Sequence, residues 1–298
     1  MEILKNCMLC PRKCGVNRYE KVGACGATNK IRLGYYHLHE WEEPVLSGKN
    51  GSGTIFFSHC NMKCIYCQNK KISLDGYGKL ISNKKLGEIM IKLQEMGAHN
   101  INLVTPTHYV PNIASVLHKL KGKALNIPVV YNTSSYENIG TLMMMNKLVD
   151  IYLADLRYYD DSLAINYSSA PDYFEVATMA IDEMYRQVGS PEFDKDGLMT
   201  KGLIVRVLIL PGHLEDAKKI IKYLYKTYGD DIFISIMNQY TPVNTCIYQN
   251  LNRKLTEDEY NEVIKYALEL GVTNAFIQEE GTQEESFIPD FNTNVIWF

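Results

Sequence analysis

The chain has 298 residues, of which 46% are hydrophobic, and a formal net charge of −3. This length and composition predict one α/β domain with a large core, or one such domain with a small appendage. The near-neutral charge and the lack of a long basic run argue against nucleic acid as a partner. No stretch reaches the roughly 18 consecutive apolar residues of a membrane span, and residues 1–14 lack the apolar core of a secretory signal, so we expect a cytoplasmic protein without a membrane partner.

Four of the eight cysteines lie close together near the N-terminus, at C-x2-C-x3-C-x10-C spacing: Cys7, Cys10, Cys14 and Cys25. In a reducing compartment such thiols are expected to bind metal before they form disulfides. Four thiolates can hold one zinc ion in a closed tetrahedral site or fully ligate an iron–sulfur cluster, and the spacing does not choose between them. Free or oxidised thiols are the third alternative. We therefore divide the chain into a Cys-rich N-terminal extension with a linker, residues 1–49, and a main domain, residues 50–298.

The linker carries alternating histidines, His37 and His39, followed by Trp41-Glu42-Glu43-Pro44. The two histidines are a candidate metal pair, but a strand or loop that packs His and Trp against the main domain is the better interpretation. Three glycines then mark turns ahead of the first predicted strand.

A second group of cysteines, Cys60, Cys64 and Cys67, follows an apolar run, residues 54–57, that reads as a strand. Three thiolates in a short loop can bind three irons of a [4Fe-4S] cluster and leave the fourth iron without a protein ligand. A metal with an open position can bind a substrate, as catalytic sites do. The alternatives are buried free thiols or a structural zinc knuckle with His59 as a fourth ligand.

The rest of the chain alternates between helical and strand-like periodicity. Helices are predicted over residues 83–97, 110–120, 137–148, 171–188, 214–228 and 256–270, and strands over 100–104, 128–133, 150–156, 203–210, 232–237 and 272–277. Asn83 is the candidate N-cap of the first of these helices, and Thr256 with Glu259 predicts a capping box on the last. Strands separated by single helices imply right-handed βαβ units, so we expect an α/β fold with a partial TIM-type barrel and its chemistry at the carboxyl ends of the strands.

The segment Cys60-x3-Cys64-x-Tyr66-Cys67 resembles the C-x3-C-x-aromatic-C signature of the radical S-adenosylmethionine (SAM) superfamily. The resemblance implies an open (β/α)6 barrel and a [4Fe-4S] cluster held by the three cysteines, with its free iron chelated by SAM. It further implies that an electron, from a donor such as flavodoxin or ferredoxin, cleaves SAM to a 5′-deoxyadenosyl radical that abstracts hydrogen from a substrate. The cluster and SAM carry that chemistry, and the protein positions them.

The candidate SAM-binding residues follow the predicted strands, apart from Tyr66 in the cysteine loop: Tyr66, Thr105, Thr107, Asn132, Ser134, Asp155, Arg157, Arg206 and Gln239. Thr105-Pro106-Thr107 stands where the superfamily commonly has a Gly-Gly-Glu segment, so no carboxylate is available there for the SAM amino group. Asn132-Thr133-Ser134 and Asp155-Leu156-Arg157 resemble segments of the small activases of glycyl-radical enzymes. Arg157 could grip the methionine carboxylate with two hydrogen bonds. Arg206 lies within an apolar run and needs a partner if it is buried.

The N-terminal cysteines and the Trp41-Glu42-Glu43-Pro44 segment extend the resemblance to the pyruvate formate-lyase activating enzyme-like branch, PflX. That branch suggests hydrogen abstraction from a glycine of a partner protein. Two other functions stay open: radical modification of a small molecule or a peptide, and a non-enzymatic iron–sulfur or zinc protein for electron transfer or scaffolding.

Overall fold

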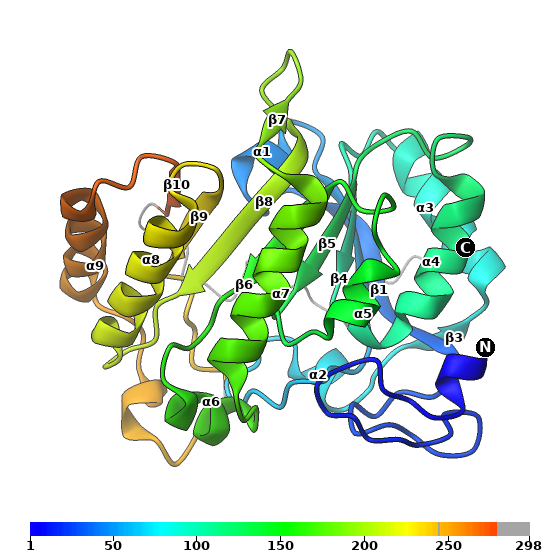
Figure 1. Cartoon of the computed structure of the whole chain (residues 1–298), viewed down its shortest axis with the longest axis horizontal. Coiled ribbons are helices and arrows are strands. Elements are labelled where there is room, and N and C mark those ends of the chain that lie inside the picture. The colour runs from blue at the N-terminus through cyan, green and yellow to red at the C-terminus, as the bar shows by residue number, and fades with distance from the viewer. Residues whose placement is uncertain (244, 279–298) are drawn as a thin grey trace.

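The computed structural model describes residues 1–243 and 245–278, and it is built on one mostly parallel sheet (Figure 1). Strand order is β10-β9-β8-β6-β5-β4-β2-β1-β3. The parallel strands are β2 (Ser52–Phe57), β4 (Ile101–Val104), β5 (Val129–Thr133), β6 (Ile151–Asp155), β8 (Met199–Leu208), β9 (Phe233–Met237) and β10 (Ala275–Ile277). Among the described residues no hydrogen bonds join β10 to the other end of the sheet. The prediction of an α/β fold with an open, partial TIM-type barrel is therefore confirmed.

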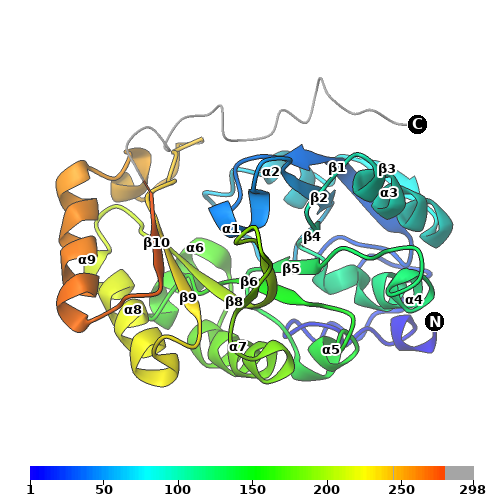
Figure 2. The same cartoon turned by 90° about the horizontal axis from the view of Figure 1, so that it is seen from above.

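A helix of the outer layer follows each of these parallel strands except β10, and the helices cover the outer face of the curved sheet (Figure 2). They are α3 (Asn83–Glu95), α4 (Val110–Leu120), α5 (Ile139–Met143), α7 (Tyr173–Val188), α8 (Leu214–Tyr228) and α9 (Glu257–Leu270). In α8 the buried residues are Ala217, Ile220, Ile221, Leu224 and Tyr228, spaced along one face as the sequence predicts. None of the helices in the described ranges has both the length and the hydropathy that crossing a bilayer would demand.

Helix N-termini show one correct and one wrong prediction. The capping box on α9 is present, because Thr256 Oγ1 accepts from the Glu259 amide at 3.2 Å and the Glu259 carboxylate accepts from the Thr256 amide at 3.0 Å. The N-cap of α3 is Ser82, which accepts from the Lys85 amide at 3.1 Å, and not Asn83. Asn83 instead accepts a hydrogen bond from Asn112 on α4.

Removing the α9 cap should measurably destabilise the protein. We expect Thr256→Ala to lower the free energy of unfolding by about 1 kcal/mol, because the Glu259 amide in the first turn of α9 loses its acceptor. Urea unfolding followed by circular dichroism measures the change. Thr256→Ser keeps the hydroxyl and should lose less than half as much; equal losses in both variants would contradict the capping role.

Several elements differ from the predictions in extent. Residues 31–39, expected as linker with a strand or loop at the histidines, form the strand β1 (Ile31–His39), which pairs antiparallel with β2 and with β3 (Lys79–Ile81). A register shift between Leu33 and Tyr35 breaks the alternation that would have marked this strand. After β1 the chain turns through α1 (Pro44–Ser47) and enters β2.

Other boundaries also differ. β8 begins at Met199, ahead of the predicted strand 203–210, because it pairs with β7 (Glu192–Phe193). The helix predicted over 137–148 shortens to α5, and α6 (Asp161–Ser168) appears in a stretch that was left unassigned.

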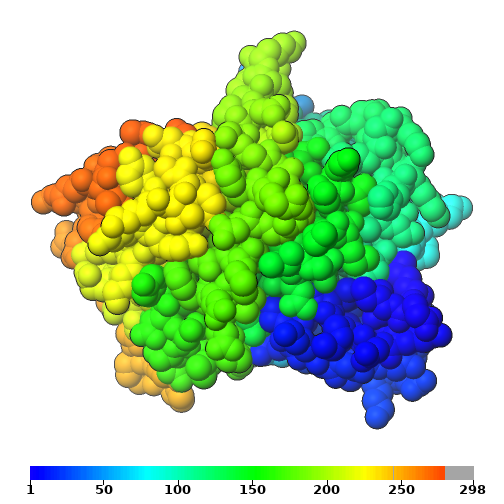
Figure 3. Space-filling model, in the orientation of Figure 1, coloured from blue at the N-terminus to red at the C-terminus, as the bar shows by residue number. Residues whose placement is uncertain are grey.

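The Cys-rich N-terminal segment contains little regular structure: a 3-10 helix, Glu2–Leu4, and turns. It packs below the N-terminal half of the barrel, where it forms the blue layer of Figure 3. Asn138 and Thr141, at the start of α5, donate hydrogen bonds to the carbonyls of Met8 and Leu9 at 2.8 and 2.6 Å. The segment buries only a small apolar cluster of its own, Leu4, Cys7 and Leu9, so it also depends on these contacts or on a bound metal.

Candidate active site

A cavity of about 840 Å3 opens inside the curved sheet, at the carboxyl ends of its strands. Every predicted site residue of the main domain except Thr107 lines it: Cys60, Cys64, Tyr66, Cys67, Thr105, Asn132, Ser134, Asp155, Arg157, Arg206 and Gln239. These residues come from the cysteine loop and from the ends of five strands. Parallel strands end at one edge of a sheet, so residues about 180 positions apart meet in one place.

The cysteine loop, residues 58–69, is fixed to α6. The amides of Lys63 and Ile65 donate to the carbonyls of Ser168 and Tyr167 at 3.1 and 2.9 Å. Each thiol also has a polar neighbour: the Met62 amide reaches Cys60 Sγ at 3.4 Å, and the hydroxyls of Ser168 and Ser73 reach Cys64 and Cys67 at 3.0 and 3.2 Å. Donors to sulfur stabilise thiolates, so this loop suits three metal-bound sulfurs.

The donor set fits an iron–sulfur cluster with one open iron. Burial raises the pKa of the Cys60 and Cys67 thiols, and repulsion from Cys64 adds to the shift, so a bound cation favours their thiolate forms. Three thiolates in one short loop can each bind a different iron of such a cluster.

His59 does not complete a zinc knuckle. It does not line the cavity, and its ring lies between Gly26 and Gly76, so close that a methyl group on either glycine would collide with it. Its backbone is left-handed, with φ of 74°, which turns the chain from β2 into the cysteine loop.

Tyr66 joins a chain of hydroxyls that ends on Cys64. Its hydroxyl lies 2.5 Å from that of Tyr158, which lies 2.6 Å from Ser168 Oγ, and Ser168 Oγ donates to Cys64 Sγ at 3.0 Å. Burial raises the pKa of Tyr66 to about 12, so the phenol stays protonated and can act as a donor. On its other side Tyr66 packs edge-on against Tyr240, with the ring centroids 5.8 Å apart. These rings close the wall of the cavity beside the cysteines.

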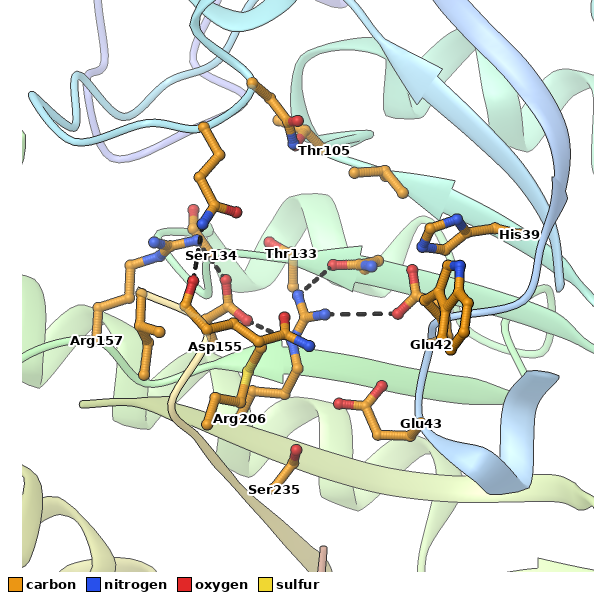
Figure 4. Close-up of a pocket in the computed structure, with 18 of the residues that line it drawn as sticks. His39, Glu42, Glu43, Thr105, Thr133, Ser134, Asp155, Arg157, Arg206 and Ser235 are labelled. Atoms are coloured by element: carbon orange, nitrogen blue, oxygen red, sulfur yellow. Dashed lines mark hydrogen bonds and ion pairs between the residues drawn. The ribbon is translucent and has the colours of Figure 1, made fainter. Parts of the chain in front are cut away.

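A buried ionic network crosses the cavity (Figure 4). Asp155 accepts from Arg157 Nη2 at 2.5 Å and from Arg206 Nε at 2.7 Å. Arg206 Nη2 donates to Asn132 Oδ1 at 2.8 Å, and Arg206 Nη1 lies 3.6 Å from the Glu42 carboxylate. Arg206 thus has the partners that its place in an apolar strand required. Burial alone would raise the pKa of Asp155, but Arg206 and Arg157 outweigh it and hold this pKa below its ordinary value.

Arg157 keeps part of its hydrogen-bonding capacity for a ligand. Its Nη2 is used by Asp155, whereas its Nε has no partner among the residues that the structure describes. The Asp155 charge keeps the pKa of Arg157 well above its usual value, although burial opposes it. A fixed guanidinium with an unused N–H suits a carboxylate of a bound molecule.

Glu42 and Glu43 belong to the cavity, and the sequence analysis missed them. They lie between β1 and α1, and they line the end of the cavity that is opposite the cysteine loop. Glu42 accepts from Asn102 Nδ2 at 2.9 Å. Burial raises the pKa of both carboxyl groups, that of Glu43 to about 7, and Arg206 only partly offsets the effect. The sequence did contain a signal for these two residues. Arg206 lies in an apolar strand and needs an anionic partner, and two adjacent glutamates precede the first barrel strand.

Thr107 lies outside the cavity. The chain turns away at Thr105, which has φ of 58°, and Thr107 becomes part of a 3-10 helix, Thr107–Tyr109. Its hydroxyl donates to the buried carboxylate of Glu137 at 2.6 Å, as that of Thr133 also does. The structure therefore places Thr105, and not Thr107, among the residues that can reach a bound ligand.

The N-terminal cysteines form a second group of buried sulfurs. Cys7, Cys10 and Cys25 are buried and Cys14 is half-buried, and all four are free thiols. Cys14 and Cys25 flank Gly23, and Cys7, Cys14 and Cys25 are close enough to repel one another as thiolates. Burial is the main cause that raises the pKa of Cys10, to about 12.

This module contacts the cysteine loop directly. Arg12, between Cys10 and Cys14, donates from Nε to the carbonyl of Asn61 at 2.8 Å and from Nη2 to that of Ser168 at 3.4 Å. Arg18 is fully buried, donates to the carbonyl of His108 at 2.6 Å, and has Nη1 3.9 Å from Cys7 Sγ. The two groups of cysteines are thus linked through hydrogen-bonded side chains.

Comparison with solved structures concerns the fold. Streptococcus suis SuiB bound to the precursor peptide SuiA aligns with a TM-score of 0.52 and 13% identity, over 75% of this chain and 47% of SuiB. The FeFe-hydrogenase maturase HydG from Carboxydothermus hydrogenoformans aligns with a TM-score of 0.50 and 13% identity, over 77% of this chain and 54% of HydG. The chain thus spans about half the length of these two proteins.

Sequence comparison gives the family. The uncharacterized protein MJ0674 of Methanocaldococcus jannaschii is 32% identical over 281 residues, which are 89% of this chain and 75% of the relative. The family model of the radical SAM superfamily matches residues 54–238, from β2 through β9. That range holds the three-cysteine loop and the cavity residues Asn132, Asp155, Arg157 and Arg206, whereas Glu42, Glu43 and Gln239 lie outside it. The chain therefore belongs to the radical SAM superfamily, a family of enzymes that bind an iron–sulfur cluster and SAM.

Proposed function

We propose that this protein binds a [4Fe-4S] cluster through Cys60, Cys64 and Cys67, cleaves SAM reductively, and abstracts hydrogen from a substrate held in the same cavity. One observation carries the proposal: the three-cysteine loop opens onto the cavity that Asp155, Arg157 and Arg206 cross. When bound, the cluster supplies one electron to SAM, and the resulting 5′-deoxyadenosyl radical removes a hydrogen atom from the substrate.

The residues of this chain then bind and orient SAM. The unused Nε of Arg157 is suited to the methionine carboxylate, while Asp155 fixes the guanidinium in place. Ser134 and Thr105 line the same side and offer hydroxyls and carbonyls to the amino group. Gln239, whose carbonyl accepts from Gln68 at 2.8 Å, holds the cysteine loop against β9 and is suited to the adenine. Tyr66 and Tyr240 keep water from the reacting atoms.

Two substrate classes have separate support. The likeness of Asp155-Leu156-Arg157 to the activase segment supports a glycine in a partner protein, in keeping with the PflX-like branch. The depth of the cavity and its charged far end support a small polar molecule or a peptide end, because such groups can reach buried carboxylates. An electron paramagnetic resonance signal of a glycyl radical on an added partner protein supports the first class. Modification of a small molecule without such a signal supports the second.

We also propose that Cys7, Cys10, Cys14 and Cys25 bind a second metal centre, and that flavodoxin or ferredoxin supplies the electron for SAM cleavage. The four thiols are buried together, and a segment without regular structure gains stability from a metal. Their spacing suits an iron–sulfur cluster or a closed zinc site, and the metal content distinguishes the two.

The metal content tests this second centre. We expect about eight irons per chain in the anaerobically reconstituted protein and about four in the variant Cys7→Ala/Cys10→Ala. Cys246→Ala removes a cysteine outside both groups and should keep all eight. About four irons and one zinc in the wild type would support the closed zinc site instead, and an unchanged metal content in the double variant would rule out either centre.

The proposed function itself is tested by adding dithionite and SAM to the reconstituted protein and measuring 5′-deoxyadenosine. Its formation supports a SAM-cleaving enzyme. Its complete absence, in protein that carries the cluster, would favour the electron-transfer or scaffold alternative.

A further inference from the structure

The far end of the cavity, opposite the cysteine loop, is a floor built by the segment between β1 and β2. Leu46, in α1, is fully buried in the apolar cluster with Val130, Leu153 and Ile204, at the base of the sheet. The Leu46 carbonyl accepts from Asn100 Nδ2 at 2.8 Å. The Glu43 carbonyl accepts from the amides of Leu46 and Ser47 at 2.8 and 3.1 Å, which places Glu43 at the floor, facing Ser235 (Figure 4).

One carboxylate of this floor has no matching cation. Three buried carboxylates lie in the network, Glu42, Glu43 and Asp155, against two guanidinium groups, Arg157 and Arg206. Asp155 binds both arginines, and Arg206 also reaches Glu42 at 3.6 Å. No direct ion pair joins Glu43 to either arginine. In the described part of the chain the cavity lining includes no lysine that could supply the missing charge.

Glu43 also has a free hydrogen-bond acceptor. The residue is 9% exposed, and its Oε2 has no partner among the described residues. A buried carboxylate oxygen without a donor is costly, and water occupies such a position only until a better donor displaces it. Burial raises the pKa of Glu43 to about 7, so a cation that arrives there meets a group that ionises readily near neutral pH.

We infer that Glu43 binds a protonated amine of the substrate, so that the substrate class is an amine-bearing molecule or a peptide with an amino group. Such a group supplies both the missing positive charge and the missing donor, whereas a hydroxyl or an amide supplies only the donor. The indole of Trp41 lines the cavity two residues before Glu43, and an ammonium group is attracted to an indole face. The inference rests on the proposed function, because it assigns the substrate end of that site.

Binding of a simple amine tests the inference without any turnover. The probes are 2-phenylethylamine and its neutral counterpart 2-phenylethanol, titrated into the full-length, cluster-reconstituted protein with SAM and without reductant, and followed by saturation-transfer nuclear magnetic resonance. We expect the wild type to bind the amine roughly ten- to a hundredfold more tightly than the alcohol, as hydrogen bonds to charged groups do. In Glu43→Gln the two affinities should become nearly equal.

Controls make each outcome decisive. Glu175→Gln removes an exposed carboxylate of α7 and should keep the wild-type preference. Glu43→Asp keeps the charge and should keep the preference even if Glu43→Gln fails to fold. Equal affinities for both probes in the wild type, or an undiminished preference in folded Glu43→Gln, would overturn the inference. So would a loss of SAM affinity alone in Glu43→Gln, because Glu43 would then serve the amino group of SAM.

The outcome is independent of the test of the proposed function. A preference for the amine in protein that never forms 5′-deoxyadenosine would leave the amine site intact and remove the proposed function. Formation of 5′-deoxyadenosine without any preference for the amine would overturn this inference alone.

Discussion

Cys64→Ala should abolish formation of 5′-deoxyadenosine and lower the iron content of the reconstituted protein. Cys64 is the middle and most buried cysteine of the loop, and its sulfur accepts from Ser168 at 3.0 Å. Alanine removes one of the three proposed iron ligands. Mutation of a group that only orients a metal ligand lowers activity or metal affinity roughly ten- to a hundredfold. Loss of a ligand itself should therefore lower the activity more than a hundredfold.

Cys246→Ala is the matched control. Cys246 is half-buried, its thiol donates to the Tyr248 carbonyl at 3.4 Å, and it does not line the cavity. We expect this variant to form 5′-deoxyadenosine at the wild-type rate. Equal activity of Cys64→Ala and Cys246→Ala would refute the assignment of the cluster to the cysteine loop.

Arg206→Met should destabilise the metal-free protein by about 3–5 kcal/mol. Methionine fills a similar volume but removes the cation that lies between Asp155 and Glu42, and a buried charge left without its partner is expensive. Urea unfolding at pH 7, followed by circular dichroism under anaerobic, reducing conditions, measures the loss.

The destabilisation should depend on pH. In the wild type the pKa of Asp155 is held below its ordinary value of 3.8, so this group stabilises the fold above about pH 4 and loses that contribution as the pH falls through its folded pKa. In Arg206→Met the carboxylates become neutral on acidification and need no partner. The difference between wild type and variant should therefore be largest at neutral pH and shrink toward pH 4.

Arg186→Met provides the comparison. Arg186 also pairs with a carboxylate, that of Glu183 at 2.6 Å, but 58% of its side chain is exposed. Exposed pairs contribute about 0–1 kcal/mol, so this variant should lose no more than that. If Arg206→Met unfolds at the same urea concentration as Arg186→Met, the network does not stabilise the fold.

The elements that carry the candidate chemistry were predictable because each one is encoded locally. The thiol spacing of Cys60, Cys64 and Cys67 lies within eight residues, and the periodicity of 214–228 and the capping box at Thr256 are equally local. Asp155 and Arg157 could be named because they end an apolar strand, and parallel strands end at a common edge. These signals also gave the open barrel.

The floor of the cavity could not be predicted in this way, because it depends on contacts between distant residues. Arg206 clearly needed an anion, but pairing of β8 with β6, and the path of the chain after β1, decide that Asp155 and Glu42 supply it. β1 was expected only as a strand or loop around His37 and His39, because its register shift hides the alternation that would have given its bounds. Likewise Thr105 and Thr107 look equivalent in sequence, and only the left-handed backbone at Thr105 turns Thr107 toward Glu137.

The sequence by itself determined the candidate cysteine ligands, the alternation of the main strands and helices, and the end of the barrel that carries the candidate site, since spacing and periodicity are properties of short segments. Tertiary structure alone decided which charges meet, which carboxylate is left unmatched at Glu43, and how the N-terminal cysteines contact the cysteine loop through Arg12. The physical reason is that burial and pairing of charges depend on which segments pack together, and local sequence contains no record of those partners.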